Sequence, residues 1–326
     1  MKILLASSID PDAINWLRER HEVVSAFNAP QEVLQAHIKD REVLIFRSGV
    51  EITAQVLESA PRLKLLVRAG SGFDNIDLDY LQQRRIRMVR SPGPGAQAVA
   101  EMAFALMLAL ARNLLEADRL WRQGRWAKFE LVGHLLKGKT LGIVGCGNIG
   151  SRVGQLGVAW GMQSWGCVDD PKPQIATALR QHGIVLKEFR ELLAGADFVS
   201  IHVPLQDSTR YMFNEETLSW IKPGAFLINL ARGGVVDERA LYQALTEGRL
   251  RGAALDVHEK EGQGMISPLA GSPNVILTPH IGAMTIDSQR EIGRIVTQII
   301  SAFESANGTP VKLDHLEVDD YKLQMA

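Results

Sequence analysis

Cysteine is scarce in this chain, since Cys146 and Cys167 are the only two among its 326 residues. Neither has a second cysteine at Cys-x-x-Cys spacing, so the sequence predicts no disulfide framework and no set of metal ligands. So few cysteines suit a reducing compartment, and the cytoplasm is therefore the expected location.

Long apolar runs are missing as well. Residues 102–111 form an apolar run of ten residues, about half of what a helix needs to cross a bilayer, and this run predicts a buried helix instead. The N-terminal stretch MKILLAS has one lysine and too short an apolar run for a signal peptide, so it predicts a first strand. We expect no membrane partner.

An excess of either charge is also absent. The chain has 36 basic and 37 acidic side chains, which gives a formal net charge of −1. Without a broad basic field, nucleic acid is not an expected partner, whereas a small molecule or another protein is. The apolar share, 46%, is large enough at this length for two hydrophobic cores.

Short β-rich runs alternate with helical patterns from residue 2 to about residue 92, which predicts crossover units and a parallel sheet covered on both faces. A second alternation begins at residue 140 and ends near residue 279. The predicted strands are residues 2–7, 21–26, 42–47, 63–69 and 87–92, then 140–145, 163–169, 183–188, 197–203, 225–231, 252–257 and 275–279.

Two long helical patterns flank the second alternation. Residues 98–126 are apolar on most faces at first and then amphipathic, which predicts one helix that bridges the domains and contacts a second subunit. Residues 285–305 predict a long amphipathic helix. The tail after Gly308 is polar, and we expect it to be loosely held.

The stretch TLGIVGCGNIGSRVG places Gly145, Gly147 and Gly150 in Gly-x-Gly-x-x-Gly spacing between a predicted strand and a predicted helix. The first glycine permits a tight turn, the second lets the backbone approach a pyrophosphate, and the third lets helix and strand pack closely. The amides at the helix N-terminus can then hold phosphates. Because any tight turn favours glycine, this pattern needs a second signal.

An acidic residue supplies that signal. The next predicted strand ends at Asp169, nineteen residues after Gly150, where a carboxylate accepts hydrogen bonds from ribose hydroxyls and repels a 2′-phosphate. The pair of features favours NAD over NADP. Asp170 takes this role if the strand runs one residue longer, and Lys172 leaves some use of NADP open. Each aspartate can also be an ordinary solvated strand end.

Three polar residues follow predicted strands: Arg232 in ARGG, Glu261 in DVHEKEG and His280 in LTPHIG. They should lie at the carboxyl ends of parallel strands, where open α/β sheets bind ligands. A guanidinium matches a carboxylate with a planar fork, and a carboxylate can fix the tautomer of a histidine that titrates near neutrality. Taken singly, each has a structural explanation, and Glu259 competes with Glu261.

At this point the chain resembles the D-isomer-specific 2-hydroxyacid dehydrogenase family, which includes phosphoglycerate, glyoxylate/hydroxypyruvate and D-lactate dehydrogenases. The resemblance implies a flavodoxin-like substrate domain, residues 1–95 with 285–326, and a Rossmann-type NAD-binding domain, residues 96–284. It also implies a homodimer built on the cofactor domain. The matching stretches, which together cover nearly the whole chain, are RAGSGFDNIDL, VAEMAFALMLALAR, GIVGCGNIG, HVPL, LINLARGGVVDE, GAALDV and TPHIGAMT.

The family's activity is the NAD-dependent interconversion of a small D-2-hydroxy acid and its 2-oxo acid. By resemblance, Arg232 binds the substrate carboxylate, His280 exchanges the proton and Glu261 orients His280. Glu261 is preferred to Glu259 because it falls five residues after Asp256, as in the family pattern. The resemblance adds these cofactor contacts: Ser71, Val99, Asn148, Ile149, His202, Val203, Pro204, Leu230, Ala231, Asp256, Gly282 and Ala283.

The first domain would supply substrate contacts too. The resemblance implies that backbone amides of Ala69, Gly70, Ser71 and Gly72 bind the substrate carboxylate. Arg47 and Arg68 are candidates for binding a phosphate or a second carboxylate, and each can also be an ordinary surface arginine. Both domains would then contribute to one cleft that closes and expels water.

Two positions depart from the family pattern. Gly262 replaces a usual proline, and Ala98 replaces a frequent serine, so the choice of substrate stays open. The same motifs also allow a non-catalytic NAD(H)-sensing protein of the corepressor type. The lack of a basic bias favours the enzyme.

Overall fold

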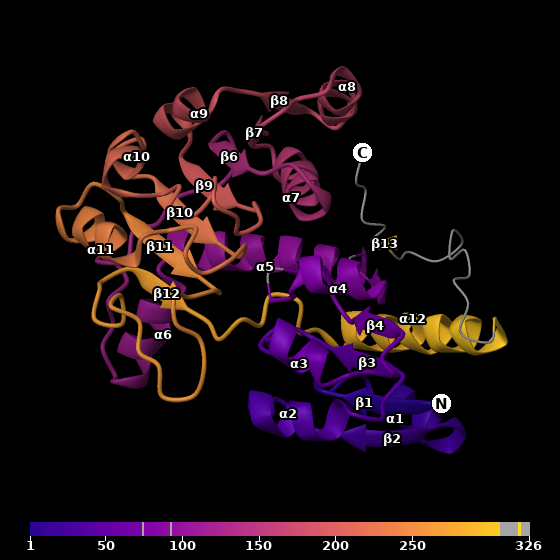
Figure 1. The fold of residues 1–326 in the computed structure, drawn as a ribbon. Coiled ribbons are helices and arrows are strands. Elements are labelled where there is room, and N and C mark those ends of the chain that lie inside the picture. Colours follow the sequence, from indigo (N-terminus) through magenta and orange to yellow (C-terminus); the bar gives the residue numbers. More distant parts are fainter. Residues whose placement is uncertain (74, 92, 307–318, 321–326) are drawn as a thin grey trace. The chain divides into compact units, whose positions relative to one another are not determined.

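The computed structural model describes residues 1–73, 75–91, 93–306 and 319–320. The chain divides into two compact units: unit 1 comprises Met1–Gly95 and Met284–Ala326, and unit 2 comprises Ala96–Ala283. Each unit contains one largely parallel sheet with helices on both faces (Figure 1). The predicted α/β fold class is therefore confirmed.

The sheet of unit 1 has the strand order β13-β5-β4-β3-β1-β2. Its five parallel strands give the order 2-1-3-4-5 of a flavodoxin-like fold, and β13 pairs with β5 in the antiparallel sense. The strands are β1 (Lys2–Leu5), β2 (Glu22–Ser25), β3 (Val43–Phe46), β4 (Leu65–Arg68), β5 (Arg87–Arg90) and β13 (Asp319–Asp320). The rest of the predicted loose tail lies outside the described residues.

The alternation of side chains along β1 explains the layers of unit 1, because successive residues point to opposite faces. Ile3 and Leu5 pack with α1 and α12, whereas Leu4 packs in the core on the other face. The helices are α1 (Pro11–Arg20), α2 (Gln31–Ile38), α3 (Ala54–Glu58), α4 (Leu78–Arg84) and α12 (Ile286–Ser305).

The sheet of unit 2 has the strand order β12-β11-β10-β9-β6-β7-β8. Read from β8, this is the 3-2-1-4-5-6 order of a Rossmann-type fold with one strand added at the end. The strands are β6 (Thr140–Val144), β7 (Gln163–Cys167), β8 (Ile184–Leu186), β9 (Phe198–Ile201), β10 (Phe226–Asn229), β11 (Gly252–Leu255) and β12 (Val275–Leu277).

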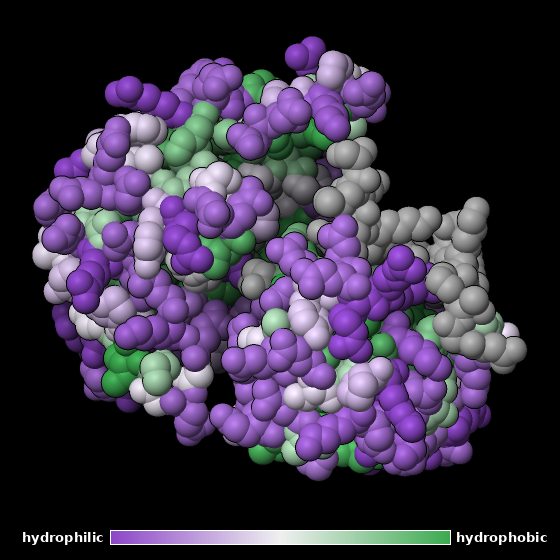
Figure 2. All heavy atoms as spheres, viewed as in Figure 1, coloured by the Kyte–Doolittle hydropathy of each residue, from purple (hydrophilic) through white to green (hydrophobic). Residues whose placement is uncertain are grey.

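Helices cover both faces of this sheet. One core joins Ile143 and Ile228 to α5, α7 and α8, and the other joins Leu227 to α9, α10 and α11. Figure 2 shows a mostly hydrophilic exterior, as expected when the apolar residues line these cores. The remaining helices are α5 (Gly93–Ala111), α6 (Leu114–Arg122), α7 (Asn148–Ala159), α8 (Pro173–Gln181), α9 (Phe189–Gly195), α10 (Glu215–Ser219) and α11 (Glu238–Thr246).

The single helix predicted over residues 98–126 is wrong, because the structure has two helices there. Asn113 adopts φ 52°, a left-handed conformation that a right-handed helix cannot continue through, and it separates α5 from α6. In the described part of the chain, α5 alone is long and apolar enough to cross a membrane by length and composition. Ala100, Phe104 and Met107 of α5 are buried in the core of unit 2.

Candidate active site

The residues predicted to carry chemistry in unit 2 follow the strands of its sheet. Gly145 follows β6, Arg232 follows β10, Asp256 follows β11 and His280 follows β12. Since these strands are parallel, the four residues lie along one edge of the sheet, its carboxyl edge.

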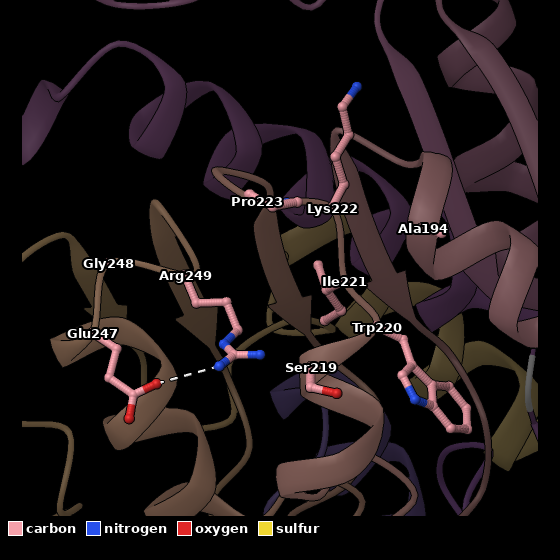
Figure 3. A pocket seen from close by; sticks show the side chains of 9 residues that line it. All are labelled: Ala194, Ser219, Trp220, Ile221, Lys222, Pro223, Glu247, Gly248 and Arg249. Carbon is pink, nitrogen blue, oxygen red and sulfur yellow. Dashed lines mark hydrogen bonds and ion pairs between the residues drawn. The ribbon is translucent and has the colours of Figure 1, made fainter.

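A pocket of about 480 Å³ lies on the opposite edge (Figure 3). Its lining includes Ile221 and Pro223, which precede β10, and Arg249, which precedes β11. Figure 3 shows Glu247 and Arg249 turned toward each other, with their charged groups 3.5 Å apart. Because this pocket is at the amino ends of the strands and its arginine is paired, we do not assign the chemistry to it.

The turn between β6 and α7 is built as the glycine spacing predicts. A Cβ atom at Gly150 would lie 1.9 Å from the carbonyl oxygen of Gly145, so helix and strand approach too closely for any side chain. A Cβ atom at Gly147 would meet no atom of the described chain within 4 Å. Gly147 caps α7 without a side-chain hydrogen bond from the described residues, and the space beside its Cα is open, so a phosphate can approach the backbone there.

Both cysteines lie beside this turn. Cys146 stands between the first two glycines, and Cys167 ends β7 opposite Val144. Burial raises the pKa of Cys146 to about 12 and also raises the pKa of Cys167. Both thiols are free and, being protonated at neutral pH, they are poor nucleophiles.

His202 packs against the same turn from the end of β9. Its carbonyl oxygen would lie 2.7 Å from a Cβ atom at Gly145, and the side chain of Val203 would lie 2.9 Å from it. The ring of His202 lies 2.8 Å from the hydroxyl of the buried Ser200. Burial lowers the pKa of His202 to about 3, so its ring is neutral at physiological pH. The predicted segment HVP therefore lies next to the predicted phosphate turn.

Glu261 and His280 form a hydrogen-bonded pair. The Nδ1 atom of His280 is 2.8 Å from Oε2 of Glu261, and the two side chains are about one-third exposed, at 30% and 38%. Burial raises the pKa of Glu261, but the hydrogen bond and charge of His280 outweigh it and hold this pKa below its usual range. The competitor Glu259 accepts a hydrogen bond from the backbone of Glu238 instead.

Asp256 holds the segment that carries His280. Its carboxylate accepts hydrogen bonds from the Thr278 hydroxyl at 2.6 Å and from the backbone amides of Ile281 at 2.9 Å and Gly282 at 2.7 Å. Asp256 is 2% exposed, and its carbonyl oxygen also accepts from the amide of His280. The contact with the cofactor that the resemblance implies for Asp256 stays a prediction.

Arg232 lies in a turn that Asn229 braces. The buried Asn229 side chain accepts from the amide of Ala231 and donates to the carbonyl oxygen of Arg232, both at 3.0 Å. The next residue, Gly233, packs so tightly that a Cβ atom there would lie 1.8 Å from the carbonyl oxygen of His258. The Arg232 turn therefore rests directly on the loop that leads to Glu261.

Further residues that were predicted to contact the cofactor also gather at this edge. A Cβ atom at Gly282 would lie 2.9 Å from Asp256 and 3.4 Å from both Leu230 and Val99. The predicted positions Val99, Leu230, Asp256 and Gly282 thus lie close together. Ala283 packs against the hydrophobic core that contains Val99 and Leu230. Asp169 and Asp170 are both exposed after β7, so the choice between them stays open.

Unit 1 has its own cluster of cations at the carboxyl ends of β3, β4 and β5. Arg47 contacts Gln289 at 2.5 Å and Met284 at 3.3 Å, and burial lowers its pKa. Arg68 donates to the carbonyl oxygen of Gly72 at 2.8 Å. Arg90 donates to that of Ser71, also at 2.8 Å.

The amides predicted to bind the substrate carboxylate lie beside these arginines. Those of Ala69 and Gly70 donate to the carbonyl oxygens of Phe46 and Arg68. These two amides are therefore already hydrogen-bonded within unit 1. The predicted contact with the substrate carboxylate is then left to the amides of Ser71 and Gly72.

Comparison with known proteins identifies the family. The family model of the D-isomer specific 2-hydroxyacid dehydrogenases, NAD binding domain, matches residues 104–282, more than half of the chain. The chain belongs to this family. The matched residues all lie in unit 2, which contains the glycine turn, Arg232 and the Glu261–His280 pair.

Several members of the family are similar over most of this chain. A D-3-phosphoglycerate dehydrogenase of Methanocaldococcus jannaschii is 40% identical over 92% of the chain, and a hydroxypyruvate reductase of Thermotoga maritima is 37% identical over 87% of it. The solved D-lactate dehydrogenase of Aquifex aeolicus, complexed with NAD and lactic acid, has a TM-score of 0.83 at 29% identity and covers 95% of this chain and all of its own.

The relatives differ in length. This dehydrogenase-family chain spans 57% of the M. jannaschii protein but 92% of the T. maritima protein.

Two residues of the site were not found by sequence reasoning. Asn229 and His258 hold the segments that carry Arg232 and Glu261. A polar residue inside the apolar strand FLIN was the available signal for Asn229, whereas nothing in the sequence singled out His258.

Proposed function

We propose that this chain is an NAD-dependent oxidoreductase that interconverts a small D-2-hydroxy acid and its 2-oxo acid. The hydrogen bond of 2.8 Å between His280 Nδ1 and Glu261 Oε2 carries the proposal, because it is the arrangement that an acid/base histidine needs. The fit of the glycine turn to a dinucleotide supports it.

The proposal gives each of these residues a role. With Nδ1 of His280 directed at Glu261, Nε2 is the nitrogen that exchanges a proton with the substrate oxygen. The Glu261 carboxylate stabilises the imidazolium that forms when a hydroxy acid is oxidised. Arg232 binds the substrate carboxylate and fixes its orientation. NAD supplies the hydride chemistry when bound.

A substrate panel tests the proposal. We expect purified protein to oxidise NADH with at least one of glyoxylate, hydroxypyruvate, pyruvate, 2-oxoglutarate and 3-phosphohydroxypyruvate. His280→Ala should lower kcat by about 100-fold or more, the usual contribution of a general acid/base. Arg232→Ala should lower kcat/KM by about 100-fold, since two charge-assisted hydrogen bonds are worth roughly 3 kcal/mol, while the affinity for NADH changes little.

Arg249→Ala is the matched control for the arginine, because Arg249 lies on the opposite edge of the same sheet. Full activity of His280→Ala would exclude the acid/base role, and equal losses of NADH and substrate binding in Arg232→Ala would exclude the carboxylate role. NADH binding without turnover of any 2-oxo acid would instead favour a sensing protein.

The arginines of unit 1 support a narrower substrate class. Arg47 is partly desolvated and has neutral partners, Gln289 and Met284, in the described chain. A desolvated guanidinium gains most from an anion. We therefore propose a substrate with a second anionic group, such as a phosphate, and expect Arg47→Ala to raise KM for 3-phosphohydroxypyruvate more than KM for pyruvate.

An exposed apolar band in unit 2 supports a homodimer. Seven large side chains of α6 and the segment around it are more than half exposed: Leu114, Leu115, Trp121, Trp126, Phe129, Val132 and Leu135. Exposed large apolar side chains gathered along one segment indicate a protein interface. We propose that a second copy of the chain covers this apolar band.

A further inference from the structure

A second histidine, His258, contacts the two segments that carry Glu261 and His280. The backbone amide of His258 donates to Oε1 of Glu261 at 3.1 Å, while the other oxygen of that carboxylate binds His280. The ring of His258 reaches the other segment, with Nε2 at 3.0 Å from the carbonyl oxygen of Thr278, two residues before His280. His258 therefore touches both segments that carry the pair.

The contact with Thr278 fixes the tautomer of His258. A carbonyl oxygen accepts hydrogen bonds and cannot donate them, so Nε2 of the ring must carry the proton. The side chain is 14% exposed, which shields this bond from water. The same Thr278 donates its hydroxyl to Asp256, so the bond joins His258 to the brace that holds His280.

A buried carboxylate, that of Glu238, holds the loop that follows His258. Glu238, 3% exposed, begins α11, and its Oε1 and Oε2 atoms accept from the amide of Glu259 at 2.8 Å and the hydroxyl of Ser267 at 2.7 Å. The amide of Glu238 donates in return to the side chain of Glu259. These hydrogen bonds hold the loop at Glu259, before Glu261, and at Ser267, after it.

The remaining nitrogen of the His258 ring faces that carboxylate. Nδ1 is buried, has no hydrogen-bond partner in the described part of the chain, and lies 4.0 Å from Oε1 of Glu238. A phenyl ring would fill the same space without burying an unpaired nitrogen, whose desolvation is unfavourable. A side chain that only fills space does not account for these contacts.

We propose that His258, supported by Glu238, is a positioning residue that keeps Glu261 and His280 at hydrogen-bonding distance. The proposal rests on the proposed function for its kinetic consequence, but its geometric claim stands apart from any activity. His258 acts through Glu261 and His280 and does not exchange a proton with the substrate.

Replacement of the ring tests this role. In His258→Phe the ring volume stays while the bond to Thr278 is lost, so we expect kcat to fall between about tenfold and about 100-fold, the range for small displacements of catalytic groups and for loss of supporting hydrogen bonds. KM for NADH and for the 2-oxo acid should stay near the wild-type values. His258→Gln should recover most of kcat, because its amide nitrogen occupies the place of Nε2.

A measurement without turnover accompanies the kinetics. The proton on Nδ1 of His280, assigned by its absence in His280→Ala, should give a protected NMR resonance in the wild type and in His258→Gln. It should exchange with water in His258→Phe. His182→Phe, on an exposed histidine after α8, is the control that should change neither readout.

Unchanged kcat together with an unchanged His280 resonance in His258→Phe would overturn the proposal. If that variant fails to fold by circular dichroism, His258→Asn replaces it, since its shorter amide cannot reach Thr278. If the wild type turns over no 2-oxo acid, the proposed function fails, while the resonance still decides whether His258 positions the pair.

Discussion

His280 adopts a backbone conformation that non-glycine residues rarely take, with φ 54°. Such a conformation costs of order 1–3 kcal/mol and persists where the surroundings impose it. Asp256 does so here, because its carboxylate and carbonyl oxygens bind the segment on both sides of His280. The strained residue is thus the one for which we propose proton transfer.

His202 should make the protein sensitive to acid. Its pKa of about 3 in the native state lies below the value of about 6.5 in an unfolded chain. The unfolded state therefore binds the proton first as the pH falls. The contribution of the neutral His202 ring to stability is fully present above about pH 6.5, and the free energy of unfolding falls by about 1.4 kcal/mol for each pH unit below that. Chemical denaturation at pH 7.5 and 5.0 measures the loss.

His202→Gln keeps a polar partner for Ser200 without a titrating ring. Between pH 7.5 and 5.0 it should lose about 2 kcal/mol less stability than the wild type, whereas the exposed His182→Gln should behave like the wild type. Equal losses in the wild type and His202→Gln would mean that the folded protein does not hold the His202 ring neutral in this pH range.

At the level of elements, the turn from β6 to α7 separates two roles of glycine. Gly150→Ala places a methyl group against the backbone of Gly145 and should destabilise the protein by about 2 to 3 kcal/mol. Gly147→Ala meets only open space in the described chain, so its melting temperature should match the wild type.

The same substitution at Gly147 should weaken NADH binding by about tenfold, or roughly 1.4 kcal/mol, because the methyl group stands where the pyrophosphate approaches. Calorimetric titration with NADH measures this. Unchanged NADH affinity in Gly147→Ala would contradict the assignment of the turn to the cofactor.

Sequence patterns predicted the strands well because buried parallel strands are short apolar runs with turn residues at both ends. They failed at Asn113, where one asparagine in a left-handed conformation ends a pattern that otherwise continues as a helix. For the site, the patterns placed Arg232, Glu261 and His280 after strands. They could not give the braces from Asn229 and His258, because a sequence does not show which distant backbone group a side chain reaches.

At the level of the whole molecule, a net charge of −1 gives little repulsion between copies, and the apolar band supplies surface for association. Trp126 and Phe129 in this band are 70% and 84% exposed. Light scattering should give a mass of about 72 kDa, twice the 35.9 kDa of one chain.

Phe129→Asp should shift that mass to one chain, because a charge buried without a partner at the interface opposes association. Ile175→Asp on α8 is the control, since Ile175 is also exposed, at 43%, but lies outside the band. If the wild type has the mass of one chain at micromolar concentration, or Phe129→Asp stays at twice that mass, another contact must cover the apolar band.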